Sequence, residues 1–269
     1  DEVAARDLLV TLVQNYPDSR FVPESWVRIG EYWFSHAEGS EDLEKARDAY
    51  QNAMAFEDSD FYDKALYKLA WTYYRLDAFD QAITEFKRLV QYSDDQKAKT
   101  GRSGSVLRAE AVQYIAVSLA EPDWDLDGSV DPEFGLPRVQ TYLAGEVPYE
   151  REVLVQLVDY MFDNTRYGIA EDVIRYTLER YPRNQENPQL HEKLVLALMR
   201  DGRTDDAFSE RSKLLAYYGP ESDWYAYQKR VGREEALTFT GLGKWANWME
   251  VAGRARAAHP GITEAEIEE

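Results

Sequence analysis

Alternating carboxylates in one acidic segment are the residues whose types and spacing most directly suggest chemistry. Asp123, Asp125 and Asp127 occupy every second position, Gly128 follows them, and Asp131 comes three residues later. Carboxylate oxygens are the ligands that a hard cation such as Ca²⁺ prefers, and a glycine permits the sharp turn that brings them together. The segment therefore predicts a Ca²⁺ site formed by Asp123, Asp125, Asp127 and Asp131.

This D-x-D-x-D-G segment resembles the first half of an EF-hand calcium loop. The resemblance ends where the EF-hand has a bidentate glutamate, because Phe134 occupies that position and Glu133 lies one residue earlier. The chain contains 50 Asp and Glu residues, so such a run also arises from composition and forms a solvated acidic loop. Two interpretations stay open: Ca²⁺ bound here, or no cofactor at all.

Residues suited to catalysis are few. The only histidines are His36, His191 and His259, which lie in separate segments, and the chain has no cysteine. His191 falls on an expected helix, where a histidine is commonly a partly buried structural residue. The sequence has no motif with the spacing of a zinc peptidase, a serine hydrolase or a phosphate-binding loop. We therefore expect a protein that is not an enzyme.

The charge balance restricts the partners. With 31 Lys and Arg against 50 Asp and Glu, the net charge is −19. Nucleic acids and anionic membranes are bound through Lys and Arg, so we expect neither nucleic-acid binding nor direct membrane insertion, but a protein or peptide partner. No apolar run is long enough to span a bilayer. The chain begins with Asp1 rather than Met, so we expect a processed or truncated part of a longer protein.

Amphipathic helices must position these residues, and the segment 62–92 shows their pattern most clearly. Apolar residues share one face of each of two helices, which a polar turn at Asp77 and Ala78 separates. The first helix carries Leu66, Leu69, Ala70 and Tyr73, and the second carries Phe79, Ala82, Ile83, Phe86 and Leu89. Neither helix can bury its apolar stripe alone, so the pair needs neighbours.

This helix pair resembles a tetratricopeptide repeat (TPR). The family pattern has a bulky residue, a Leu-Gly pair and a Tyr in the first helix, then Ala-x3-Phe in the second. The matching residues are Leu66, Leu69, Ala70, Tyr73, Ala82 and Phe86; the final proline of the pattern is replaced by Asp94. The resemblance implies an all-α fold, a TPR-like α-α superhelix in the form of a right-handed solenoid of antiparallel helix pairs.

Looser copies of the pattern extend over nearly the whole chain, which we expect to be a single TPR-like solenoid over residues 1–269. A half repeat at 1–18 ends in Tyr16-Pro17, and the same ending recurs as Tyr181-Pro182. The polar residues from Ser93 to Ser105 predict a loop. The expected repeats are 23–58, 63–94, 106–145 (interrupted by the acidic insertion), 150–182 and 188–219, with capping helices and a tail over 220–269.

The Tyr-Pro endings and loose repeats also resemble the bacterial envelope subclass of TPR proteins. This subclass includes the outer-membrane assembly lipoprotein and the periplasmic coordinator of the Tol-Pal system. The interrupted repeats are similar to large repeat proteins of gliding machinery. The resemblance implies a location in the periplasm or cell envelope, and the cytoplasm is the alternative.

In a TPR solenoid the first helices line a concave groove. Tyr67, Trp71 and Tyr74 beside Arg75 have the composition of interface hot spots, although such rings also pack against neighbouring helices. The groove positions that hold a peptide carboxylate in chaperone-binding members lack the required basic residues here. Counting from the family pattern, the expected partner-binding residues are Glu31, Phe34, Tyr67, Trp71, Tyr74, Arg75, Gln113, Asp159 and Phe162.

Together these observations predict a non-catalytic protein–protein interaction scaffold. It would bind a peptide or partner protein in the concave groove, as a component of a larger, bacterial envelope assembly. The alternative is a Ca²⁺-tuned structural module in which the acidic insertion, rather than the groove, is the functional part.

Overall fold

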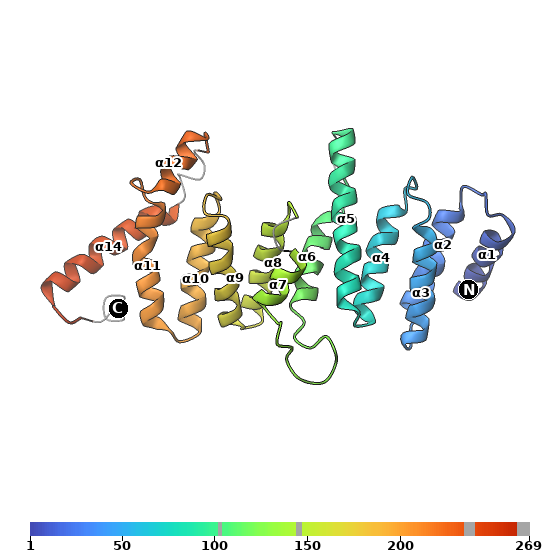
Figure 1. Ribbon diagram of the computed structural model, residues 1–269, viewed down its shortest axis with the longest axis horizontal. Coiled ribbons are helices and arrows are strands. Elements are labelled where there is room, and N and C mark those ends of the chain that lie inside the picture. The colour runs from blue at the N-terminus through green and yellow to red at the C-terminus, as the bar shows by residue number, and fades with distance from the viewer. Residues whose placement is uncertain (102–103, 144–146, 234–239, 263–269) are drawn as a thin grey trace. The chain divides into compact units, whose positions relative to one another are not determined.

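Every regular element of the computed structural model is an α-helix within the described residues, which are 1–101, 104–143, 147–233 and 240–262. The chain divides into two compact units, unit 1 (Asp1–Ala144) and unit 2 (Gly145–Glu269). The helices of unit 1 are α1 (Glu2–Asn15), α2 (Val22–Ser35), α3 (Ser40–Ala53), α4 (Tyr62–Arg75), α5 (Phe79–Thr100), α6 (Arg108–Leu119) and α7 (Leu136–Leu143) (Figure 1). The helices of unit 2 are α8 (Glu150–Asp163), α9 (Tyr167–Arg180), α10 (Asn187–Arg200), α11 (Thr204–Tyr218), α12 (Asp223–Arg230) and α14 (Thr240–Ala258).

Helices that follow one another in the chain pack side by side within each unit. In unit 1 each helix from α1 to α5 contacts the next one, and α2 also contacts α4. In unit 2 the same order holds from α8 to α12, and α14 packs against α11. Because the connecting turns are short, successive helices run antiparallel. The predicted all-α, TPR-like fold of helix pairs is confirmed, while the single solenoid over 1–269 stays a prediction.

The turn inside three of the helix pairs has the same left-handed geometry. Its central residue has a positive φ: 55° at Asp77, 59° at Thr165 and 78° at Gly202. The next N–H then bonds back to a carbonyl five residues earlier, which satisfies a free helix-end acceptor. These bonds are Ala78 to Tyr73 (3.0 Å), Arg166 to Met161 (2.8 Å) and Arg203 to Leu198 (2.9 Å).

The linkers between successive pairs also repeat one hydrogen-bond pattern, in which an N–H bonds to the carbonyl three residues earlier, twice in succession. In each linker the second residue donates to the carbonyl of the first, and the third donates to that of the second. The three sets are Tyr16, Ser19 and Val22; Phe56, Ser59 and Tyr62; and Tyr181, Asn184 and Asn187. The residues before the two prolines, Tyr16 and Tyr181, have nearly equal dihedral angles, with φ −133° and ψ 58° against φ −125° and ψ 57°. The two Tyr-Pro endings therefore form the same linker backbone.

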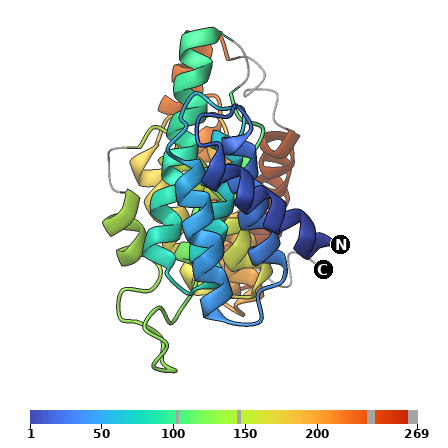
Figure 2. The ribbon, with the colours of Figure 1, turned by 90° about the vertical axis from the view of Figure 1, so that its right-hand side faces the viewer.

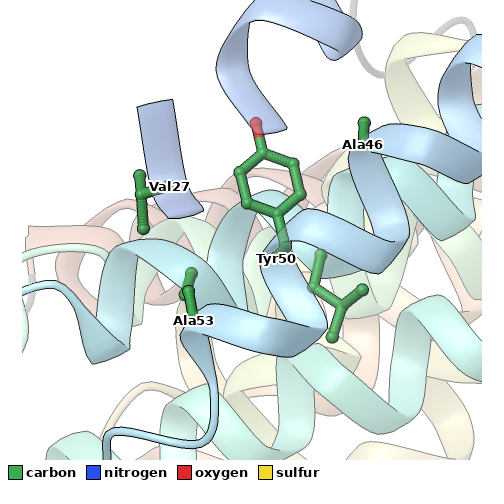
Figure 3. Close-up of a cluster of buried hydrophobic side chains, with 6 residues drawn as sticks. Val27, Ala46, Tyr50 and Ala53 are labelled. Atoms are coloured by element: carbon green, nitrogen blue, oxygen red, sulfur yellow. The ribbon is translucent and has the colours of Figure 1, made fainter. Parts of the chain in front are cut away.

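The core between α2, α3 and α4 centres on Tyr50, whose side chain is fully buried. A Cβ added to Gly30 would lie 2.5 Å from Cε1 of Tyr50, so only a glycine in α2 leaves room for this ring. Burial raises the pKa of Tyr50, and its hydroxyl has no hydrogen-bond partner among the described residues. The ring packs in a cluster with Val27, Ala46, Ala53, Ala65 and Leu69 (Figure 3).

The prediction of a loop from Ser93 to Ser105 is wrong for residues 93–100. α5 continues as a helix to Thr100, and Gly101 ends it with a φ of 68°. No glycine or proline interrupts residues 93–100, and basic residues in the last turn complement the helix dipole. As a result α5 projects beyond its neighbours in unit 1, and the acidic insertion between α6 and α7 forms a separate projecting loop (Figure 2).

Candidate partner-binding surface

Aromatic rings from α4 and α6 gather on one face of unit 1. Tyr67, Trp71 and Tyr74 are spaced four and three residues apart, which places them on one side of α4. The Trp71 ring lies 4.3 Å from the ring of Tyr114 in α6, 5.5 Å from Tyr74 and 6.4 Å from Tyr67. All four side chains are half-buried. We call these four residues the aromatic surface.

Hydrogen bonds hold two of the three tyrosines of this surface in place. The hydroxyl of Tyr67 donates to a carboxylate oxygen of Glu110 at 2.6 Å, and that of Tyr74 donates to Glu121 at 2.7 Å. Burial, together with the hydrogen bond to Glu110, raises the pKa of Tyr67 to about 12. Tyr67 is therefore a neutral donor at physiological pH. The two hydrogen bonds thus fix the positions of the Tyr67 and Tyr74 rings.

Arg75 and Phe34 connect α4 to α2 beside the aromatic surface. The guanidinium of Arg75 donates to the backbone carbonyl of Phe34 at 2.6 Å and lies 4.6 Å above the Phe34 ring. The ammonium of Lys68 lies 5.4 Å from the same ring. The guanidinium of Arg75 therefore already has contacts within its own chain.

The other residues expected in the groove lie on α2, α6 and α8. Glu31 pairs with Arg28 at 3.0 Å on α2, and Gln113 is exposed on α6. Asp159 and Phe162 lie on α8 in unit 2, where Asp159 pairs with Lys193 and the buried Phe162 ring lies under the cations of Lys193 and Arg200. Within unit 1 the structure thus brings together Phe34, Tyr67, Trp71, Tyr74 and Arg75, while Asp159 and Phe162 belong to unit 2 and their role stays a prediction.

The sequence analysis did not identify Tyr114, which completes the aromatic surface. It also did not identify Glu110 and Glu121, whose carboxylates accept the hydrogen bonds of Tyr67 and Tyr74. The family pattern predicts Gln113 on the groove face of α6. α6 instead turns Tyr114 toward Trp71. The only signal in the sequence is the aromatic type of Tyr114, because no local pattern predicts its orientation toward Trp71.

The acidic insertion brings three of its four predicted ligands together. One carboxylate oxygen of each of Asp123, Asp125 and Asp131 lies within 4.8 Å of the others. Asp127 is outside this group, and its carboxylate accepts hydrogen bonds from the backbone N–H and hydroxyl of Ser129 at 2.8 and 2.5 Å.

The same carboxylates already have partners within the chain. Asp123 accepts the N–H of Gly128 at 2.9 Å. Asp131 pairs with Arg138, which is buried 4.1 Å above the ring of Trp124. The positive charge of Arg138 opposes a cation at Asp131. Ca²⁺ binding stays a prediction, and thermal melts with Ca²⁺ and with Mg²⁺ measure it directly through the stabilisation that a bound ion gives.

The comparisons with known proteins agree with the helix pair at α4 and α5. The tetratricopeptide repeat family matches residues 64–95. This segment is therefore similar to a tetratricopeptide repeat. No curated protein matches the chain in sequence. Among the residues that the structure describes, no helix has both the length and the apolar character needed to cross a membrane.

Several solved structures are similar to the chain at low identity. The MamA protein shares 17% identity over 74% of this chain and 93% of its own, with a TM-score of 0.34. A tetratricopeptide repeat protein from Parabacteroides merdae shares 15% identity over 100% and 90%, with a TM-score of 0.37. YrrB, described as a TPR protein with an unusual peptide-binding site, shares 12% over 82% and 97%, with a TM-score of 0.34. Sequences this divergent carry no information on the partner of this chain.

Proposed function

We propose that this chain is a non-catalytic scaffold that binds a peptide or partner protein through the aromatic surface of unit 1. The observation that carries the proposal is the arrangement of Tyr67, Trp71, Tyr74 and Tyr114 as one half-buried group of rings. Tyr and Trp dominate interface hot spots because they add large contact areas and lose little side-chain entropy.

The setting of these rings supports binding rather than packing alone. The core residues Leu69, Ala70 and Phe86 are fully or almost fully buried, and the rings of Tyr67 and Tyr114 rest on Phe86 with their other sides less covered. The aromatic surface is half-buried, and two carboxylates hold two of its three tyrosines. Helix-pair repeats commonly bind partners on such surfaces. An extended or helical peptide lying across α4 and α6 would cover the rings.

The proposal includes a place for the chain in a multi-protein assembly of the bacterial cell envelope. The support is the pair of Tyr-Pro linkers at Tyr16-Pro17 and Tyr181-Pro182, which have the style of the envelope subclass. The cytoplasm is the alternative. Fractionation of the native cell, followed by detection of the protein in the periplasmic, membrane and cytoplasmic fractions, tests the location, and recovery only from the cytoplasm would contradict it.

The binding proposal is tested by affinity capture from the native organism, followed by calorimetry with the purified partner. We expect the double variant Trp71→Ala, Tyr74→Ala to bind the partner at least about ten-fold more weakly than the wild type, since hot-spot truncations cost about 2 kcal/mol or more.

The matched control is Tyr16→Ala. It also removes an aromatic side chain of unit 1, which is 66% exposed and away from the aromatic surface. We expect it to bind as the wild type does. Thermal melts of each variant verify that the fold is retained. Unchanged affinity in a folded double variant would refute the assignment.

A further inference from the structure

A cavity of about 530 Å³ lies in unit 2, where the ends of α9 and α11 meet the starts of α10 and α12. It is distinct from the aromatic surface, which belongs to unit 1. Three aromatic side chains line it: Tyr217 and Tyr218 from the end of α11, and Trp224 from the start of α12. His191 and Asn187 of α10 also contribute to the lining.

Direct contacts fix the aromatic walls of this cavity. The indole N–H of Trp224 donates to the carbonyl of Asn184 at 2.8 Å, and its ring meets Tyr218 edge to face at 5.3 Å. The hydroxyl of Tyr218 lies 3.1 Å from Nδ1 of His191. The ring of Tyr217 stacks on His191 at 5.5 Å and is 49% exposed, so it presents a π face near solvent.

Two exposed carboxylates, Glu179 and Asp223, lie at the rim of the same cavity. Neither makes a hydrogen bond or ion pair within the part of the chain that the structure describes. Glu210, deeper in the lining, is different, because Lys213 lies 3.0 Å and Arg175 3.5 Å from its carboxylate. The rim therefore carries two carboxylates that no Lys or Arg of the described residues pairs with, and the one lining cation, Arg175, is paired with Glu171 and Glu210.

A buried acceptor adds to this lining. Asn187 is 1% exposed, and its Nδ2 donates to the carbonyl of Tyr181 at 2.7 Å. Its Oδ1 accepts no hydrogen bond from the described residues. A buried acceptor without a donor is unfavourable, so a group rich in donors suits this wall.

We propose that the cavity receives a positively charged side chain, arginine or lysine, of a partner protein. Both groups carry only hydrogen-bond donors, and both are attracted to the faces of Tyr and Trp. Their charge would pair with Glu179 and Asp223, and their alkyl stem would lie along Leu178 and Pro182, which also line the cavity. The net charge of −19 further favours the approach of a basic partner. This proposal does not depend on the aromatic surface of unit 1.

The test uses the full chain and short probe peptides. The probes are acetyl-Gly-Ser-Arg-Ser-Gly-amide, the same peptide with lysine, and the same peptide with citrulline, which keeps the shape of arginine without its charge. Titrations are followed by the NMR signal of the Trp224 indole N–H. We expect the arginine and lysine peptides to bind with a Kd on the order of 1 mM, and the citrulline peptide about five-fold more weakly.

Variants separate the cavity from general charge effects. Glu179→Gln and Asp223→Asn should each weaken the arginine peptide about two- to five-fold, while Asp223→Glu retains binding. Asp205→Asn removes the same charge from the exposed start of α11, outside the cavity, and should leave the affinity unchanged. The proposal is overturned if citrulline binds as well as arginine, if Asp205→Asn weakens binding as much as Asp223→Asn, or if no basic peptide shifts the Trp224 signal.

Discussion

At the scale of single residues, Gly30 shows how one position controls the packing of a repeat, because the ring of Tyr50 leaves no room there for a side chain. We expect Gly30→Ala to destabilise the protein by about 1–3 kcal/mol, because its Cβ would lie 2.5 Å from Cε1 of the fully buried Tyr50. This loss outweighs the gain of about 1 kcal/mol in helix propensity. Urea unfolding, followed by circular dichroism, measures the change.

Gly168 provides the matched control, since it is also helical and a Cβ there would meet nothing within 4 Å. Gly168→Ala should leave the free energy of unfolding unchanged or raise it by up to about 1 kcal/mol. Equal effects of the two substitutions would show that the clash with Tyr50 is not the cause.

His191 predicts a pH dependence of stability. It is buried between Tyr218 and Glu210, and burial lowers its pKa from the ordinary value of 6.5. The unfolded chain then takes up this proton at a higher pH than the folded one. The contribution of His191 to the free energy of unfolding is therefore complete above pH 6.5 and is lost as the pH falls below it.

Thermal melts between pH 7 and pH 5 measure this effect against the variant His191→Gln. The difference in melting temperature between wild type and variant should shrink as the pH falls, by about 2–4 °C for each 1 kcal/mol lost. A difference that stays constant over this range would contradict the assignment to His191.

At the scale of elements, the left-handed turns between paired helices carry strain that depends on the central residue. Thr165 holds a φ of 59°, which is unfavourable for a β-branched residue, whereas Gly202 holds 78° without steric cost. We expect Thr165→Gly to stabilise the protein by about 1 kcal/mol and Gly202→Ala to destabilise it by about 1–2 kcal/mol. Urea unfolding of both variants tests the pair. Two shifts in the same direction would contradict this account of the turn.

The aromatic surface also depends on how whole helices pack. The spacing of Tyr67, Trp71 and Tyr74 was enough to place three rings on one face of α4. Tyr114 could not be assigned in the same way, because its approach to Trp71 depends on how α6 is rotated about its own axis. That rotation follows from packing against α5 and has no local pattern in the sequence.

At the scale of the whole molecule, the acidic composition predicts the partners that the chain avoids. With a net charge of −19, it should not bind a DNA or RNA duplex at 150 mM salt, since phosphate binding depends on the release of counterions by Lys and Arg. Fluorescence anisotropy with labelled duplexes measures this. A Kd in the micromolar range or tighter would contradict the expectation.

The sequence by itself determined the helical class and the helix pair predicted at residues 63–94, which the tetratricopeptide repeat family matches at 64–95, because helical spacing of apolar residues and small residues at close contacts are local properties. It also anticipated the equal linkers at Tyr16 and Tyr181, since a proline ends a helix wherever it occurs. The prediction of a loop from Ser93 was wrong over residues 93–100, because polar composition does not stop a helix that lacks Gly and Pro.

Only the tertiary structure decided that Arg138 pairs with Asp131, that Tyr114 joins Trp71, and that α9 to α12 enclose a cavity with unpaired carboxylates at its rim. Each of these depends on side chains from different helices, whose meeting is set by packing rather than by any spacing along the chain.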